Sequence, residues 1–170
     1  MGAGMRRALR IAVALLVAAC APDRSASAGG AEVAFVRLGE ETFTLELALD
    51  PETRHQGLSG RDAIPRNQGM LFVEARSAPL AMVMRDCPVP IDVAFLDAEG
   101  RVVAVHEMAV EPPRARGETP GAYEARLPLY GSGVPALFAI ETAGRRLREV
   151  GLGVGDRVAI DVRGLAARAR

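Results

Sequence analysis

The stretch "IDVAFLDAEGRVVAVHEM", Ile91 to Met108, is the clearest hairpin in the chain. Two apolar runs flank "DAEG", and Gly100 can adopt the positive φ that a tight turn requires. Both runs show the period-two pattern that is typical of strands. The hairpin predicts an antiparallel sheet as the framework of the fold.

Similar patterns extend in both directions from this hairpin. We expect further strands at residues 43–50, 68–75, 80–86, 135–142 and 154–162. A two-turn helix is expected after Asp50, a plausible N-cap followed by Pro51, with Gly57 or Gly60 ending it. Residues 143–152 predict a second short helix, and residues 110–133, with four prolines and four glycines, predict a long loop.

The excess of strands over helices sets the fold class. We predict a β-rich α+β domain with a small, mostly antiparallel sheet or a partly closed barrel and about two short helices. Residues 33–163 are expected to form this single domain, and residues 164–170 a disordered tail.

The N-terminus reads "MRRALRIAVALLVAAC", with arginines, a short apolar run and a cysteine after small residues. The run is too short to span a bilayer, and the pattern predicts a secretory signal over residues 1–19. "LVAAC" resembles the bacterial lipobox, which implies a lipid on Cys20 and attachment to a membrane. An ordinary signal peptide is the alternative. Residues 20–32 have the composition of a flexible tether.

Localisation follows from the same segment. Ala21 follows Cys20, which favours the periplasmic face of the outer membrane in a Gram-negative envelope. Three of the 21 basic residues lie in the leader, which leaves 18 against 21 acidic residues and a net charge of about −3. A chain without a basic stripe is not expected to bind nucleic acid.

Four segments together resemble the domain-of-unknown-function family 192 (DUF192). They are "RHQGLSGRDAIP", "GMLFV", "MVMRDCPVPIDVAFLDAEGRVVAVHEM" and "AGRRLREVGLGVGDRV", and the resemblance runs from about Phe43 to Val162. It implies a compact β-rich domain, often exported, and implies no particular reaction. The chain departs from the family pattern at residues 83–87, where Val-Met-Arg-Asp-Cys replaces the common Trp-Met-Lys-Asn-Thr.

Cys87 and His106 are weaker site candidates. A thiolate–imidazole pair would make Cys87 a nucleophile, whereas a buried thiol in place of the family's threonine is the simpler interpretation. With Cys20 lipidated, Cys87 has no partner for a disulfide within the chain. No His or Cys spacing is typical of a metal site, so we predict neither a metal nor a cofactor.

Asp92 shares its strand face with apolar Ala94 and Leu96, and a buried carboxylate needs a partner. Arg61 and Arg85 are the candidate cations, through a bidentate contact that would hold "GLSGR" against this strand. Alternatively, a polar cluster lines a pocket for a small anionic ligand. The candidate cluster comprises Arg61, Arg85, Asp86 and Asp92.

Three hypotheses for function remain open. The preferred one is a lipid-anchored envelope protein that binds a ligand or an envelope partner without catalysis, through the polar cluster and the long loop. The second is a hydrolase-like enzyme that uses Asp92 or His106 as an acid or base. The third is a structural or assembly role in the cell envelope.

Overall fold

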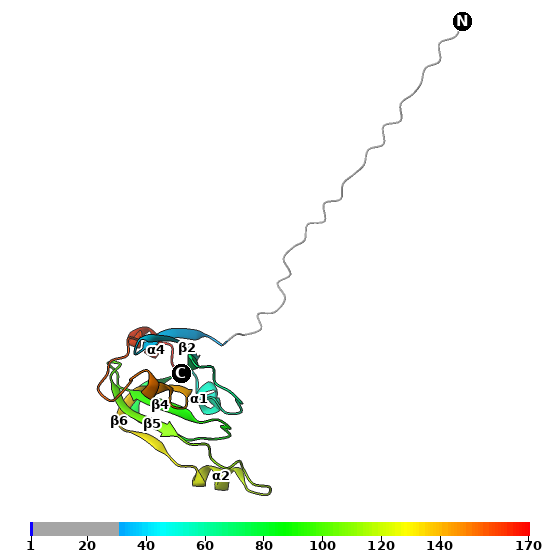
Figure 1. The fold of residues 1–170 in the computed structure, drawn as a ribbon, viewed down its shortest axis with the longest axis vertical. Coiled ribbons are helices and arrows are strands. Elements are labelled where there is room, and N and C mark those ends of the chain that lie inside the picture. The colour runs from blue at the N-terminus through cyan, green and yellow to red at the C-terminus, as the bar shows by residue number, and fades with distance from the viewer. Residues whose placement is uncertain (2–30) are drawn as a thin grey trace. The chain divides into compact units, whose positions relative to one another are not determined.

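The computed structural model describes Met1 and residues 31–170, and residues 31–170 form one compact unit. One sheet has the strand order β1-β2-β3-β6-β4-β5 (Figure 1). Its strands are β1 (Val33–Leu38), β2 (Glu41–Ala48), β3 (Gln68–Met82), β4 (Ile91–Leu96), β5 (Val102–Met108) and β6 (Tyr130–Ala143). The helices are α1 (Pro51–Gln56), α2 (Pro120–Arg126), α3 (Arg146–Glu149) and α4 (Val162–Ala166).

The predicted β-rich α+β class is confirmed. Each neighbouring pair of strands is antiparallel except β2 and β3, which are parallel and joined through α1. The sheet is open, because β1 and β5 stand at its two edges. Among the described residues there are four short helices, two more than the sequence indicates.

The hairpin is present as predicted. Strands β4 and β5 pair from Ile91 opposite Met108 to Leu96 opposite Val102. The Asp97 carboxylate accepts hydrogen bonds from two backbone N–H groups of the turn, and Gly100 has a φ of 77°. These local bonds explain why the sequence of the turn was sufficient to locate it.

The helix α1 also begins and ends as predicted. The Asp50 carboxylate accepts a hydrogen bond from the Thr53 N–H at 2.9 Å, and Pro51 occupies the first turn. Gly57 ends the helix with a φ of 51°. The helix α1 lies in the connection between β2 and β3, and parallel neighbouring strands require such a crossover.

The two strands predicted at residues 68–75 and 80–86 are one strand, β3, which ends at Met82. Both halves pair with the long β6, and the register shifts between Val73 and Ala78 and again between Pro79 and Ala81. The exposed, polar middle of β3 resembles a turn in the sequence. The chain remains one strand because the residues on both sides of this segment pair with β6, and bulges accommodate the register shifts.

Three other predictions from the sequence are wrong. The predicted loop at residues 110–133 contains α2, whose N-cap is Thr119, and the first residues of β6. Residues 154–162 form no strand; a single bridge joins Arg101 and Arg157. The segment predicted to be a disordered tail enters α4, where Leu165 is buried.

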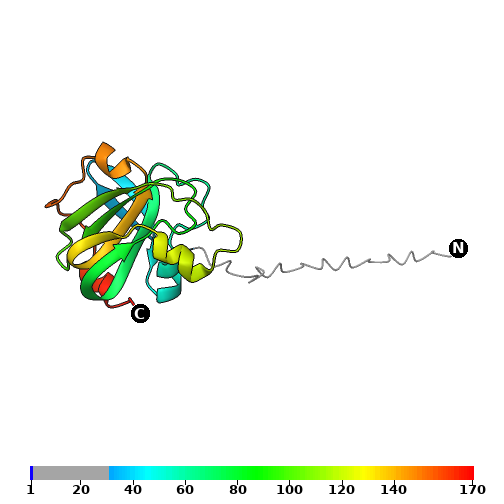
Figure 2. The same cartoon turned by 90° about the horizontal axis from the view of Figure 1, so that it is seen from below.

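Figures 1 and 2 show α2 apart from α3 and α4.

Buried side chains gather in two clusters, and alternate residues of the central strands belong to different ones. In β4, for example, Val93 and Phe95 belong to one cluster, while Ala94 and Leu96 belong to the other. Every residue of β4 is buried, as expected for a strand covered on both faces. The predicted alternation of residues 91–96 is confirmed.

Residues 2–19 of the predicted signal peptide, Cys20 and residues 21–30 of the predicted tether lie outside the described residues. Within the described part of the chain, no helix has the length and apolar character needed to cross a bilayer.

Candidate functional site

The Asp92 carboxylate does not bind an arginine. It lies in β4 with a relative exposure of 1%, and it accepts hydrogen bonds from the backbone N–H groups of Arg145 at 2.8 Å and Leu147 at 3.0 Å. Those N–H groups belong to the N-cap residue and the second residue of α3, and the N-cap side chain itself makes no capping hydrogen bond. Burial raises the pKa of Asp92 and the two backbone bonds oppose that rise. Asp92 therefore fastens α3 to the sheet, and the predicted Arg–Asp contact is wrong.

Arg61 binds a different carboxylate. Its guanidinium makes a bidentate contact with Glu46 in β2, with N–O distances of 2.6 and 2.7 Å. Hydrogen bonding to Arg61 lowers the pKa of Glu46. Because this pair is separate from Asp92, the four residues of the predicted polar cluster do not form one site.

Arg85 and Asp86 both contact α2. Arg85 forms an ion pair with Glu124 and donates to the His55 carbonyl oxygen at 3.0 Å. Asp86 has a φ of 50°, and its backbone N–H donates to the Tyr123 hydroxyl at 2.9 Å. The segment after β3 thus joins α1 to α2, and these contacts hold part of the predicted long loop, residues 110–133, at this point.

Cys87 and His106 do not form a catalytic pair. The Cys87 thiol is buried and donates to the Arg85 carbonyl oxygen at 3.3 Å, and burial raises its pKa to about 11. His106 Nε2 lies 2.8 Å from the Gly131 carbonyl oxygen, and its ring packs against Phe95 and Tyr130. A buried thiol with a raised pKa is a poor nucleophile.

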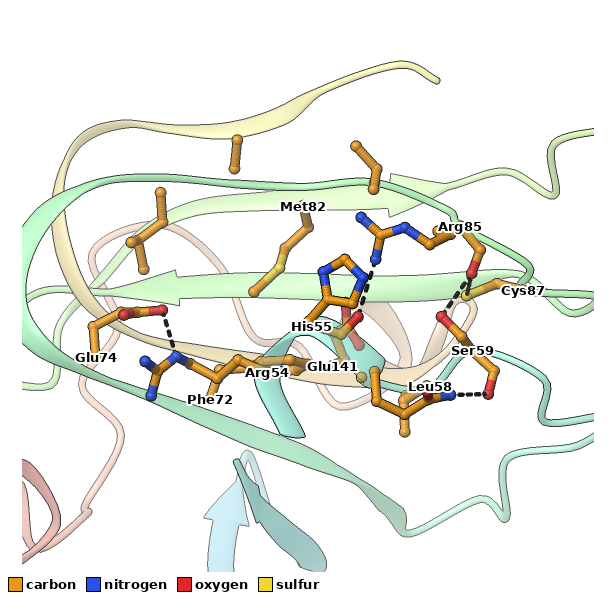
Figure 3. A pocket seen from close by; sticks show the side chains of 15 residues that line it. Arg54, His55, Leu58, Ser59, Phe72, Glu74, Met82, Arg85, Cys87 and Glu141 are labelled. Atoms are coloured by element: carbon orange, nitrogen blue, oxygen red, sulfur yellow. Dashed lines mark hydrogen bonds and ion pairs between the residues drawn. The ribbon is translucent and has the colours of Figure 1, made fainter. Parts of the chain in front are cut away.

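A cleft lies beside these residues, between α1, the second half of β3 and the segment that follows it (Figure 3). Its volume is about 250 Å³, just below the range usual for ligand pockets. Apolar side chains of Leu58, Phe72, Leu80 and Met82 line much of it. In the view of Figure 3, Arg54 and Glu74 lie toward one end and Arg85, Ser59 and Cys87 toward the other.

Glu141, a residue that the sequence analysis did not select, also lines this cleft. It lies in β6 opposite Met70 of β3 and Val93 of β4, with a relative exposure of 5%. No hydrogen bond or ion pair joins its carboxyl group to another side chain or backbone group in residues 31–170. Burial alone raises its pKa to about 8. An acid inside the apolar run "ALFAIET" was the available signal, and it resembles the end of an ordinary strand.

The cleft can bind a small molecule and offers little for covalent chemistry. The Glu141 carboxyl can accept a hydrogen bond in either protonation state and donate one when protonated. The Ser59 hydroxyl already donates to the Arg85 carbonyl oxygen at 2.7 Å. Within the described part of the chain, no three His, Cys, Asp or Glu side chains are grouped as a metal site requires.

These features define a small open-sheet domain with a buried acid, Glu141 of β6, in a lateral cleft. The family model of DUF192, described as an uncharacterized ACR, matches residues 34–160, and the chain belongs to this family. No curated protein matches the chain.

Two solved structures are similar. One is described as a "putative transcription regulator" from Sinorhizobium meliloti 1021; it is 26% identical, with a TM-score of 0.57, over 70% of this chain and 82% of that one. The other, a protein of unknown function from Novosphingobium aromaticivorans DSM 12444, is 21% identical, with a TM-score of 0.59, over 79% of this chain and 90% of that one. The second likeness concerns the fold alone.

Proposed function

We propose that this protein is a lipid-anchored envelope protein whose domain binds a small molecule in the cleft beside α1, without catalysis. The observation that carries the proposal is Glu141, whose side chain lines the cleft, is 5% exposed and has no hydrogen-bond or ion-pair partner in residues 31–170. Within those residues no wholly buried side-chain oxygen lacks a partner, so the Glu141 carboxyl group reaches the space of the cleft. Burial without a partner opposes the ionisation of a carboxyl group, and groups perturbed in this way cluster at functional sites.

The anchor and the location rest on the leader. The apolar run, the small residues before Cys20 and the tether composition of residues 20–32 together support lipidation and export. A tethered domain of net negative charge does not suit the binding of DNA. We therefore do not extend the description of the S. meliloti protein to this chain.

The contacts of Asp92 and His106 do not favour the hypothesis of an enzyme that uses either residue as an acid or base. Asp92 is occupied by the two N–H groups of α3, and His106 is bonded to a backbone carbonyl oxygen. Neither residue lines the cleft. A role in envelope assembly would instead use exposed apolar surface such as Leu129, but single exposed residues of this kind are common and carry no argument.

The test is a small-molecule screen followed by nuclear magnetic resonance, on the full-length protein in nonionic detergent. Hits should shift the amide signals of Leu58, Ser59 and Met82. The variant Ala81→Phe, which fills the cleft from an exposed lining position, should abolish those shifts. Its control is Ala63→Phe, at an exposed position outside the cleft. Hits that map elsewhere, or that survive Ala81→Phe, would contradict the proposal.

A further inference from the structure

The charged side chains around the cleft are nearly all committed to partners within the protein. The Arg54 guanidinium lies 3.2 Å from the Glu74 carboxylate and donates to the carbonyl oxygens of Val73 and Arg170. Arg85 forms an ion pair with Glu124 and donates to the His55 carbonyl oxygen, as described above. Each arginine is thus neutralised by its own glutamate, and neither is left to attract an anion.

The uncharged polar groups in the cleft have also used their donors. The Ser59 hydroxyl and the Cys87 thiol both donate to the Arg85 carbonyl oxygen. The lone pairs of the Ser59 oxygen remain available as acceptors. The buried part of the cleft therefore presents acceptors, and its arginine donors are already paired. The imidazole of His55, which is exposed at the rim, is the lining donor left without a partner in residues 31–170.

Glu141 is the buried acid of the cleft, with a relative exposure of 5% and no partner within residues 31–170. An ionised carboxylate in such a place gains most from an opposite charge, whereas a second anion would add repulsion. The apolar lining from Leu58, Phe72 and Met82 would cover a short hydrocarbon chain.

We infer that the ligand of this cleft is a small primary amine, whose ammonium group binds the Glu141 carboxylate and whose hydrocarbon part packs on Phe72 and Met82. The inference rests on the proposed binding function and names its ligand class. It replaces the anionic ligand that the sequence suggests, because the arginines of the cleft are already paired.

Because Glu141 titrates in this range, the affinity of the cleft for an amine should depend on pH in a characteristic way. Burial raises the pKa of this carboxyl to about 8, so it is largely protonated at pH 6 and must lose its proton to bind an ammonium group. The apparent affinity should rise about 50-fold from pH 6 to pH 8 and then level off. A neutral acceptor ligand would show constant affinity up to about pH 8 and a decline above it.

Other titratable or charged groups face the cleft and require a control. They are Arg54 and His55 from α1, Glu74 from β3, and Arg85 and Cys87 from the following segment. The two arginines stay charged throughout this range, and the pKa of Cys87, about 11, lies above it. The exposed His55 is removed as a source of pH dependence by the variant His55→Gln.

The experiment titrates the full-length protein with n-butylammonium, 1-butanol and butyrate at pH 6, 7, 8 and 9, following the amide signals of Ser59 and Met82. We expect n-butylammonium to bind most tightly, with the rise in affinity described above in the wild type and in His55→Gln. Glu141→Gln should remove the pH dependence and weaken butylammonium binding at least ten-fold at pH 8.

The outcomes separate the inference from the function on which it rests. If 1-butanol or butyrate binds in the cleft as tightly as n-butylammonium, the inferred ligand class is wrong, while the proposed binding function is supported. The same holds if affinity for the ammonium probe is unchanged in Glu141→Gln. If no probe binds and the small-molecule screen gives no hit in the cleft, both the inference and the proposed function fail.

Discussion

Asp92 in β4 accepts a hydrogen bond from the backbone N–H of Leu147 in α3 at 3.0 Å, across 55 residues of sequence. A helix of four residues is thereby capped by a strand side chain instead of its own N-cap residue, which is Arg145 with a φ of 70°. The sequence presents Asp92 as a member of a polar cluster. The structure assigns it to the attachment of α3.

Replacing Asp92 with alanine should lower the free energy of unfolding by about 2–3 kcal/mol, because two N–H groups at a buried helix start lose their acceptor. Urea unfolding would measure this. The exposed Asp62→Ala is the matched control and should stay within about 0.5 kcal/mol of the wild type. An equally small change in Asp92→Ala would show that α3 does not depend on this cap.

Replacing Glu141 with glutamine should stabilise the protein above pH 5. The pKa of Glu141 rises from 4.5 to about 8 on folding, so the folded state binds more protons than the unfolded state between those values. The stability that the protonated carboxyl contributes is fully present below pH 4.5. It is lost as the pH rises from 4.5 through about 8, by up to about 1.4 kcal/mol of unfolding free energy per pH unit.

Urea unfolding of the wild type and Glu141→Gln at pH 5, 6, 7 and 8 checks the expected divergence. Parallel pH profiles for the two proteins would mean that the carboxyl group has a partner or water that preserves its ordinary pKa.

The bidentate contact between Arg61 and Glu46 should contribute modestly, because both side chains are about one-third exposed. A double-mutant cycle with Arg61→Ala and Glu46→Ala should give a coupling energy of about 0.5–1 kcal/mol. These changes should not affect the pH dependence of amine binding in the cleft. A loss of that pH dependence in either single variant would assign Arg61 or Glu46 to the site after all.

Cys87 should react slowly with thiol reagents in the folded protein. Its pKa of about 11 leaves only about one thiolate in a thousand at pH 8, and the thiol is buried. Labelling of the full-length variant Cys20→Ala, in which Cys87 is the remaining cysteine, should accelerate strongly in urea. Rapid labelling without urea would restore the nucleophile hypothesis.

The proposed lipid anchor predicts a mass increase at Cys20. The wild type expressed in a Gram-negative host should fractionate with membranes, and intact-mass analysis should show acylation and loss of residues 1–19. Cys20→Ala should abolish the acylation. An unmodified, cleaved wild type would indicate an ordinary signal peptide.

The sequence by itself determined the features that depend on neighbouring residues. The hairpin at residues 91–108, the Asp50 cap of α1 and the alternation of β4 each arise from bonds or faces within a few residues. Local patterns misled where a partner far along the chain decided the outcome. The polar middle of β3 remains a strand because β6 pairs with both of its halves.

Only the tertiary structure decided the site. Burial of Glu141 depends on β3 and β4 flanking it and on α1 closing the cleft, and a single glutamate in an apolar run carries no sign of this. Likewise, the partners of three predicted site residues lie 15 to 55 residues away in the sequence, for Asp92, Arg61 and Arg85. Composition and residue spacing do not specify such partners. The sequence determines local geometry because turn and cap hydrogen bonds join residues close in the sequence. Strand pairing, desolvation and charge pairing depend on which distant segments the fold brings together.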